Sequence, residues 1–157
     1  MTRVVSKQSR EKSQDTLNIL LADDDSDDRF FFKKALRTLA IPYEFNTVED
    51  GEQLMSYLKE HAEMLPDILF LDLNMPRKNG SECLSEIKRD SRLKEVSVII
   101  YSTSLHREIA DELYKTGAHY YVKKCDYGDL VKIFEKLVAL LLENPEQPSR
   151  DNFILTS

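Results

Sequence analysis

The stretch that decides the fold of this chain is Ile68-Leu69-Phe70-Leu71-Asp72-Leu73-Asn74-Met75-Pro76. An unbroken apolar run ends at a single carboxylate, Asp72, and Pro76 then forces a loop. A run of this length is typical of a strand buried on both faces of a parallel sheet. On its own, Asp72 would more readily be the cap of a turn. Open α/β sheets, however, bind ligands at the carboxyl ends of their strands, so the rest of the chain decides its role.

An apolar run followed by an amphipathic stretch occurs five times along the chain. We predict strands over residues 17–22, 43–48, 67–72, 96–101 and 119–122. Helices are predicted from a cap at Asp25 or Ser26 to Pro42, and over 50–61, 81–89, 105–115 and 126–142. The helical residues predicted to face the core are Phe31, Phe32, Ala35, Leu36, Leu39, Leu54, Leu58, Cys83, Leu84, Ile87, Ile109, Ala110, Leu113, Leu130, Ile133, Phe134, Leu137, Leu140 and Leu141.

Five strands that alternate with five helices predict an α/β fold, a doubly wound five-stranded parallel sheet with helices on both faces. One domain over residues 17–143 accounts for all of them. Residues 1–16 are polar and are expected to form a disordered arm. Residues 144–157 form a C-terminal tail that is polar and contains proline before it turns apolar at residues 153–155.

Composition excludes several classes of function. The chain has 157 residues and a net charge of -6, which argues against sequence-independent binding of nucleic acid. No apolar stretch approaches the ~18 residues of a membrane span, and residues 1–16 lack the apolar segment of a secretion signal. Two cysteines are too few for a disulfide framework. We therefore expect a cytoplasmic protein that binds neither nucleic acid nor membrane.

Three carboxylates are predicted to meet at one edge of the sheet. Asp23 and Asp24 directly follow the first strand, and Asp72 follows the third. In a doubly wound sheet these strand ends meet at the switch point of the topology. Since unit charges 4 Å apart repel by about 4 kcal/mol at an effective dielectric near 20, the pocket must take up a proton or bind a cation. An incomplete cage of oxygen ligands suits Mg²⁺. Asp27 and Asp28 are expected to form only a solvated helix cap.

A hydroxyl and an ammonium are predicted beside these carboxylates. Ser102 ends the fourth strand and Lys124 follows the fifth. Next to an acidic cation site, such groups suit a phosphoryl group, because the cation offsets its charge and the hydroxyl donates a hydrogen bond. Each signal is weak alone, and the five positions together are strong.

The chain resembles the receiver domains of two-component response regulators, the CheY-like fold. The resemblance covers about Leu17 to Leu142 and depends on four motifs. These are Leu21-Ala22-Asp23-Asp24-Asp25, Leu71-Asp72-Leu73-Asn74-Met75-Pro76 with Gly80, Tyr101-Ser102-Thr103-Ser104, and Gly117-Ala118 leading to Tyr121 and Lys124. It implies the strand order 2-1-3-4-5. The sequences at residues 73–76 and 102–104 are similar to those of lone receivers that partner phytochrome-like sensor kinases.

The resemblance implies a role for each site residue. Asp72 would be the phosphoacceptor for a sensor histidine kinase, in a reaction that depends on Mg²⁺. Asp24 and the backbone carbonyl of Asn74 would bind the metal directly, and Asp23 through water. Ser102 would move toward the phosphoryl group, Lys124 would pair with its oxygens, and Tyr121 would be the rotating aromatic. Asn74 and Ser104 would tune the lifetime of the phosphoryl group.

The output that this resemblance implies is a change of surface. The chain is not expected to act as an enzyme on other substrates, because turnover is limited to phosphoryl transfer and hydrolysis at Asp72. Phosphorylation would bias the face formed by the last two helices and the fifth strand. Surplus apolar residues there, such as Val131, Val138 and Leu142, favour a homodimer through this face. The apolar end of the tail is expected to cover the patch or to dock on a partner's copy of it.

One departure from the family pattern leaves alternatives open. Receivers usually carry a cis Lys-Pro at the end of the fifth strand, and here the pair is Lys124-Cys125. A non-proline cis bond costs about 2.5–4 kcal/mol, so a trans bond that shifts Lys124 is possible, and Lys123 would point to the other face. This keeps open a pseudo-receiver that binds partners without phosphorylation. An aspartyl-phosphate phosphatase with its nucleophile in residues 23–26 is less favoured, because no second acidic pair follows a late strand.

Overall fold

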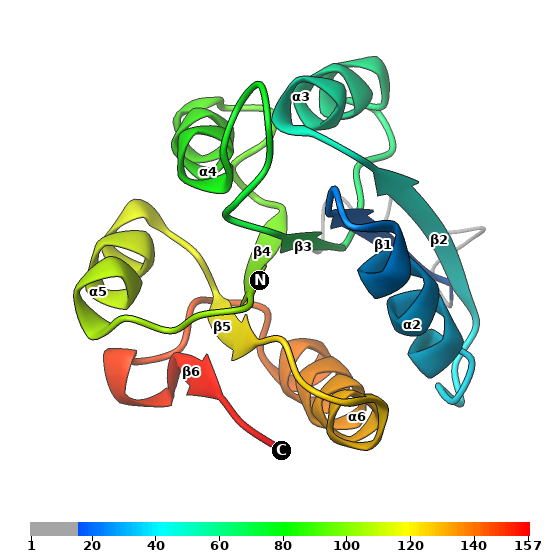
Figure 1. The fold of residues 1–157 in the computed structure, drawn as a ribbon. Helices are drawn as coiled ribbons and strands as arrows, with labels where there is room; N and C mark the ends of the chain where they lie inside the picture. The colour runs from blue at the N-terminus through cyan, green and yellow to red at the C-terminus, as the bar shows by residue number, and fades with distance from the viewer. Residues whose placement is uncertain (1–15) are drawn as a thin grey trace.

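The computed structural model describes residues 16–157 and contains one six-stranded sheet (Figure 1). All neighbouring strands are parallel, in the order β2-β1-β3-β4-β5-β6. The strands are β1 (Leu17–Ala22), β2 (Tyr43–Val48), β3 (Ile68–Leu71), β4 (Ser97–Ser102), β5 (Tyr120–Lys123) and β6 (Ile154–Leu155). The predicted fold and the order of the first five strands are confirmed. Apart from Thr16, the predicted N-terminal arm lies outside the described residues.

Five α-helices connect the strands and cover both faces of the sheet. They are α2 (Ser26–Leu36), α3 (Gly51–Glu60), α4 (Gly80–Arg89), α5 (Arg107–Thr116) and α6 (Tyr127–Glu143). Helices α3, α4 and α5 lie on one face, and α2 and α6 on the other (Figure 1). Side chains of Asp25, Asp50, Asn79 and Asp126 accept hydrogen bonds from the first turns of four of these helices. These caps explain why the helices begin where the strand-end loops stop. Between residues 16 and 157, no helix combines the length and apolar character needed to span a bilayer.

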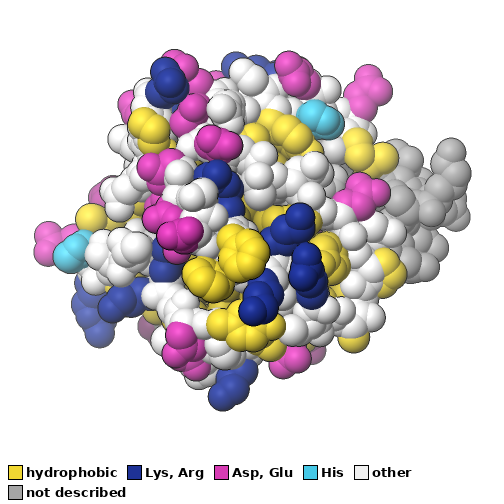
Figure 2. Space-filling model, turned by 45° about the vertical axis from the view of Figure 1, so that its right-hand side comes forward, with side chains coloured by type: hydrophobic (Ala, Val, Ile, Leu, Met, Phe, Trp, Pro, Cys, Tyr) yellow, Lys and Arg dark blue, Asp and Glu magenta, His cyan; other side chains and the backbone are white. Residues whose placement is uncertain are grey.

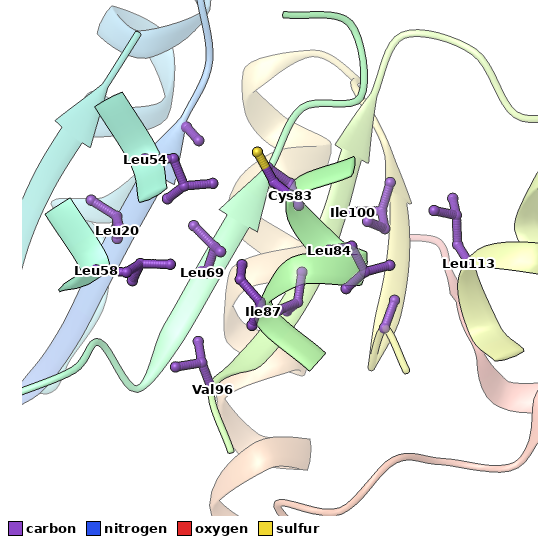
Figure 3. Packing of buried hydrophobic residues seen from close by; sticks show 14 of the residues in the cluster. Leu20, Leu54, Leu58, Leu69, Cys83, Leu84, Ile87, Val96, Ile100 and Leu113 are labelled. Carbon is purple, nitrogen blue, oxygen red and sulfur yellow. The ribbon is translucent and has the colours of Figure 1, made fainter. Parts of the chain in front are cut away.

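The two faces of the sheet carry different cores. Under α3, α4 and α5 the core is mainly aliphatic, and Figure 3 shows Leu54, Leu84 and Leu113 converging on the sheet from three helices. Under α2 and α6 the centre is Phe32, which is fully buried and contacts four aromatic rings at centroid distances of 4.7–5.6 Å. One of them, Tyr101, is the penultimate residue of β4, so the aromatic core extends to the carboxyl edge of the sheet.

Some details of the predicted helices are wrong. Helix α2 ends at Leu36, well before Pro42. Phe31 and Ile109 were predicted to face the core, but their side chains are 50% and 43% exposed. Both helices are short, so the buried stripe holds only two or three residues. The helical period alone does not fix where such a narrow stripe ends.

The C-terminal tail adds a sixth strand that the sequence did not predict. Phe153 is fully buried, its carbonyl accepts the N–H of Tyr121 at 3.0 Å, and β6 pairs in parallel with β5. The hydroxyl of Tyr114 on α5 donates to the carbonyl of Pro148 at 2.6 Å, which fixes the approach to the strand. The tail therefore packs on its own chain beside β5 and over Tyr114, while Leu142, in the patch that it was predicted to cover, remains 58% exposed. A two-residue strand is too short to give a period in the sequence.

Candidate functional site

The carboxyl ends of β1 and β3 bring three carboxylates together. The strands are adjacent, and the N–H of Asp72 donates to the carbonyl of Ala22 at 3.0 Å. Asp23, Asp24 and Asp72 each offer a carboxylate oxygen, and these oxygens lie within 4.8 Å of one another. Asp23 and Asp72 are buried and Asp24 is exposed. The cluster therefore opens to solvent on the side of Asp24.

The loop after β3 holds Asp72 in a fixed position. The N–H of Asn74 donates to Oδ1 of Asp72 at 3.2 Å, and the N–H of Gly80 donates to the carbonyl of Leu73 at 3.0 Å. A Cβ atom at Gly80 would lie 2.4 Å from the carbonyl oxygen of Asp72. No other residue type fits so close an approach without moving the backbone of Asp72. Within the same loop, Arg77 adopts a φ of 68°, in the left-handed region that favours glycine.

The charge of Asp72 is costly in this pocket. Burial raises the pKa of Asp72 from 3.8 to about 6, the nearby ammonium of Lys124 opposes the rise, and the Asp23 carboxylate adds to it. A raised carboxyl pKa means that the folded protein favours neutralisation, by a proton or by a cation. The donors of the cluster are all carboxylate oxygens, which suit hard divalent cations such as Mg²⁺.

Lys124 joins the carboxylates from the end of β5. Its Nζ lies 2.8 Å from Oδ2 of Asp23, 2.8 Å from Oδ2 of Asp28 and 3.6 Å from Oδ2 of Asp72. The side chain is only 10% exposed, and Nζ lies 5.3 Å from the centroid of the Tyr101 ring. Burial opposes the charge of Lys124, but the neighbouring carboxylates, chiefly Asp23 and Asp28, outweigh it and raise the pKa of Lys124 well above its usual value.

The prediction that Asp28 forms only a solvated cap is wrong. Asp28 lies in the first turn of α2, and its side chain bonds directly to Lys124. A second residue was missed as well, because Nη1 of Arg29 donates to the carbonyl of Asp23 at 2.8 Å. The available signal was position: the first turn of a helix that directly follows β1 starts at the same edge of the sheet as Asp23. Which side chains of that turn face inward was not deducible from the run of acids.

Ser102 and Tyr121 lie at the same edge on neighbouring strands. Ser102 ends β4, its side chain is fully buried, and its Oγ has no hydrogen-bond partner among residues 16–157. The Tyr121 ring is buried and its hydroxyl donates to the carbonyl of Ser104 at 2.6 Å. A buried hydroxyl without a partner costs free energy, so an acceptor that enters this edge of the sheet can gain a hydrogen bond from Ser102.

The replacement of the usual proline by Cys125 after Lys124 leaves Lys124 beside the carboxylates. The backbone between residues 16 and 157 contains no cis peptide bond, so the Lys124-Cys125 bond is trans. The N–H of Lys124 donates to the carbonyl of Ser102 at 2.7 Å, which ties the loop to β4. Lys123 is exposed. Although Cys125 is exposed, partial desolvation of its thiol, with the nearby carboxylates of Asp129 and Asp126, raises its pKa. This agrees with a neutral substitution rather than a reactive thiolate.

Comparison with known proteins gives one consistent result. A family model described as "Response regulator receiver domain" matches residues 19–135. Response regulator Rcp1 of Synechocystis sp. is 30% identical over 136 residues, which cover 83% of this chain and 92% of Rcp1. The crystal structure of the Mn²⁺-bound form of Rcp1 matches with a TM-score of 0.73 at 29% identity, covering 85% of this chain and 99% of that one. The phosphorylated cyanobacterial phytochrome response regulator RcpA matches with a TM-score of 0.74 at 32% identity and the same coverage.

Proposed function

Because this chain belongs to the family of response regulator receiver domains, we propose that it accepts a phosphoryl group from a sensor histidine kinase onto Asp72. The observation that carries the proposal is the setting of Asp72. Its carboxylate is buried beside two other carboxylates that suit a cation, with the Lys124 ammonium 3.6 Å away. A cation held by these carboxylates would add to the charge of Lys124 the positive charge that transfer of an anionic phosphoryl group requires.

The transfer is a displacement at phosphorus. An oxygen of Asp72 forms the new P–O bond as the P–N bond of a phosphohistidine breaks, and the imidazole leaves with the electron pair and takes up a proton. Bound to Asp23, Asp24, Asp72 and the carbonyl of Asn74, Mg²⁺ would supply positive charge to the phosphoryl oxygens. Lys124 offsets charge beside Asp72, and Ser102 supplies a hydroxyl that has no hydrogen-bond partner among residues 16–157.

Labelling with a small phosphodonor tests the phosphoacceptor. With Mg²⁺ and acetyl phosphate, the protein should gain one acid-labile phosphoryl group that hydroxylamine removes. Asp72→Asn should abolish this labelling, whereas Asp27→Asn, at an exposed acid of the same edge, should leave it intact. Undiminished labelling of Asp72→Asn would refute the assignment, and an unlabelled wild type would favour a pseudo-receiver.

Metal titration tests the cation site separately. Asp24→Ala should weaken binding of Mg²⁺ far more than Asp27→Ala, because Asp24 belongs to the carboxylate cluster and Asp27 does not. Since a cation that binds only the folded state stabilises it by mass action, Mg²⁺ should also raise the melting temperature. Equal effects of the two substitutions would mean that the site is misplaced.

We also propose that Ser102 and Tyr121 change position when Asp72 is phosphorylated. In response to the phosphoryl group, Ser102 donates its hydroxyl and Tyr121 adjusts its hydrogen bond to the Ser104 carbonyl. In this proposal Asn74 and Ser104, each two residues beyond Asp72 and Ser102, tune hydrolysis of the phosphoryl group. The result is a change in the face built from α5, β5 and α6. Substitutions at Asn74 and Ser104 should therefore change the lifetime of the phosphoryl group without abolishing labelling.

The partner that fits the edge beside Asp72 is the kinase itself. Phe30 and Phe31 on α2 are 62% and 50% exposed, and their rings contact each other at 5.4 Å. Figure 2, which brings forward the side of the molecule that carries α2, shows hydrophobic side chains near the centre of this face between acidic and basic ones. Such a patch, on the helix that begins at the carboxylate edge of the sheet, suits an interface. The similarity to RcpA, a phytochrome response regulator, favours a phytochrome-like kinase in the cytoplasm, where the free thiols of Cys83 and Cys125 would persist.

A homodimer through the α5, β5 and α6 face is also proposed. The tail covers Tyr114 there, but Leu142 is 58% exposed and Val138 is only partly buried. Sedimentation of the free form and of the Mg²⁺–beryllofluoride form, a phosphoryl mimic, tests the dimer. A Val138→Glu variant should stay monomeric. If all three samples sediment as the same monomer at micromolar concentrations, this face serves a different partner.

A further inference from the structure

Lys124 has three carboxylate neighbours, and they are not equal. Its ammonium donates a hydrogen bond of 2.8 Å to Asp28 and forms an ion pair with Asp23 at 2.8 Å, while Asp72 lies 3.6 Å away, beyond hydrogen-bond distance. The cation thus lies closer to two accessory acids than to the residue that receives the phosphoryl group. Phosphoryl oxygens on Asp72 would therefore attract an ammonium that Asp23 and Asp28 already hold at shorter distances.

The two competing acids differ in how readily they can release the ammonium. Asp23 is completely buried, and its other oxygen accepts the N–H of Asp25 at 3.0 Å. Loss of Lys124 would leave a buried charge without its cation, which is expensive. Asp28 is 33% exposed at the first turn of α2, so water and the positive end of the helix dipole can replace Lys124. Asp28 is therefore the partner that can give way.

We propose that Asp28 is a positioning residue that holds Lys124 away from Asp72 in the unmodified protein and releases it when Asp72 is phosphorylated. The inference rests on the proposed function of Asp72. In this arrangement Asp28 competes directly with the phosphoryl oxygens for the ammonium. It therefore sets how tightly the phosphorylated state is held, without contacting the phosphoryl group or the metal cluster.

The test compares Asp28→Asn with two matched variants. Asp27→Asn removes the same charge from the same helical turn but has no contact with Lys124 among the described residues. Asp28→Glu keeps the carboxylate. In beryllofluoride titrations with Mg²⁺, Asp28→Asn should tighten binding by about five-fold, as for a partly exposed ion pair at the upper end of its usual strength. Asp27→Asn should change binding by less than about two-fold, and Asp28→Glu should lie nearer the wild type than Asp28→Asn does.

A second readout follows Lys124 without any phosphoryl group. Because its Nζ lies 5.3 Å from the centroid of the Tyr101 ring, the ring current shifts the proton resonances of the last side-chain carbon. In the free protein, Asp28→Asn should move these resonances as the ammonium turns toward Asp72, and Asp27→Asn should leave them in place. A merely structural role of Asp28 would lower the melting temperature and leave both the resonances and the titration midpoint unchanged.

The outcomes distinguish a failure of the role of Asp28 from a failure of the proposed function of Asp72. Unchanged Lys124 resonances and an unchanged midpoint in Asp28→Asn overturn the role of Asp28. Equal tightening by Asp27→Asn also overturns it, because the effect is then one of net charge. A wild type that shows no response to beryllofluoride overturns the proposed function instead, and the resonances of the free proteins still decide whether Asp28 positions the ammonium.

Discussion

Replacing Asp72 by Asn should stabilise the metal-free protein at neutral pH. Burial, opposed by Lys124 and reinforced by Asp23, raises the pKa of Asp72 from 3.8 to about 6. One unit of difference between folded and unfolded pKa corresponds to about 1.4 kcal/mol, so the ionised carboxylate costs about 3 kcal/mol of folding free energy. The amide carries no charge, and its oxygen can still accept the N–H of Asn74. For a chain of this size, the gain corresponds to an increase in melting temperature of roughly 6–12 °C.

The dependence on pH identifies the cause of this gain. The raised pKa means that the folded state binds the proton more tightly than the unfolded state. The penalty on the wild type is therefore complete above about pH 6, shrinks as pH falls, and is absent below about pH 4. Urea denaturation of the wild type and Asp72→Asn with a chelator present, at about pH 7.5 and about pH 4, measures both limits. A gain of the same size at both pH values, or no gain at about pH 7.5, would refute the reasoning.

Three further predictions concern other parts of the molecule. Phe153→Ala should lower the free energy of unfolding by about 3–5 kcal/mol in urea denaturation because the ring is fully buried, and a loss below about 1 kcal/mol would mean that the tail does not pack in solution. Burial lowers the pKa of Lys88 from 10.5 to about 8, so protonation favours the unfolded state. The wild type should therefore gain stability relative to Lys88→Met as pH rises from 8 to 10.5, and a constant difference would contradict the burial. Gly80→Ala should weaken Mg²⁺ binding by more than about ten-fold, since its Cβ would press on the carbonyl of Asp72; Gly128→Ala, at an open position, is the control, and equal affinity in the two variants would contradict the close approach.

The sequence predicted the parts of the site that depend on topology. Asp23 and Asp24 follow a buried strand, Asp72 follows another, and parallel strands that are neighbours must place their carboxyl ends together. The apolar runs of β3 and of the middle of β4 are clear because these residues are buried and contain no polar interruption. Ser102 and Lys124 were located in the same way, at the ends of β4 and β5.

The residues that sequence reasoning missed depend on side-chain direction. Asp27 and Asp28 are adjacent and chemically identical, yet only Asp28 reaches Lys124. That difference arises from the angle at which α2 leaves β1, which no local pattern encodes. Likewise, neighbouring Phe31 and Phe32 differ completely in burial, because only Phe32 enters the aromatic cluster under α2. Tertiary packing, rather than propensity, decided each of these cases.

The two-residue strand β6 has a consequence for the behaviour of the protein in concentrated solution. Without it, the apolar residues of β5 would form an open sheet edge, with unpaired N–H and carbonyl groups that invite strands from other molecules. With β6 in place, the exposed edges of the sheet are a strand of two residues and β2, on which Glu44, Asn46 and Thr47 are exposed. Both are poor templates for amyloid-like addition. A chain that ends before Ser149 should therefore form aggregates rich in β-structure at concentrations at which solutions of the intact chain remain free of aggregate. This should hold even where the rest of the sheet remains folded.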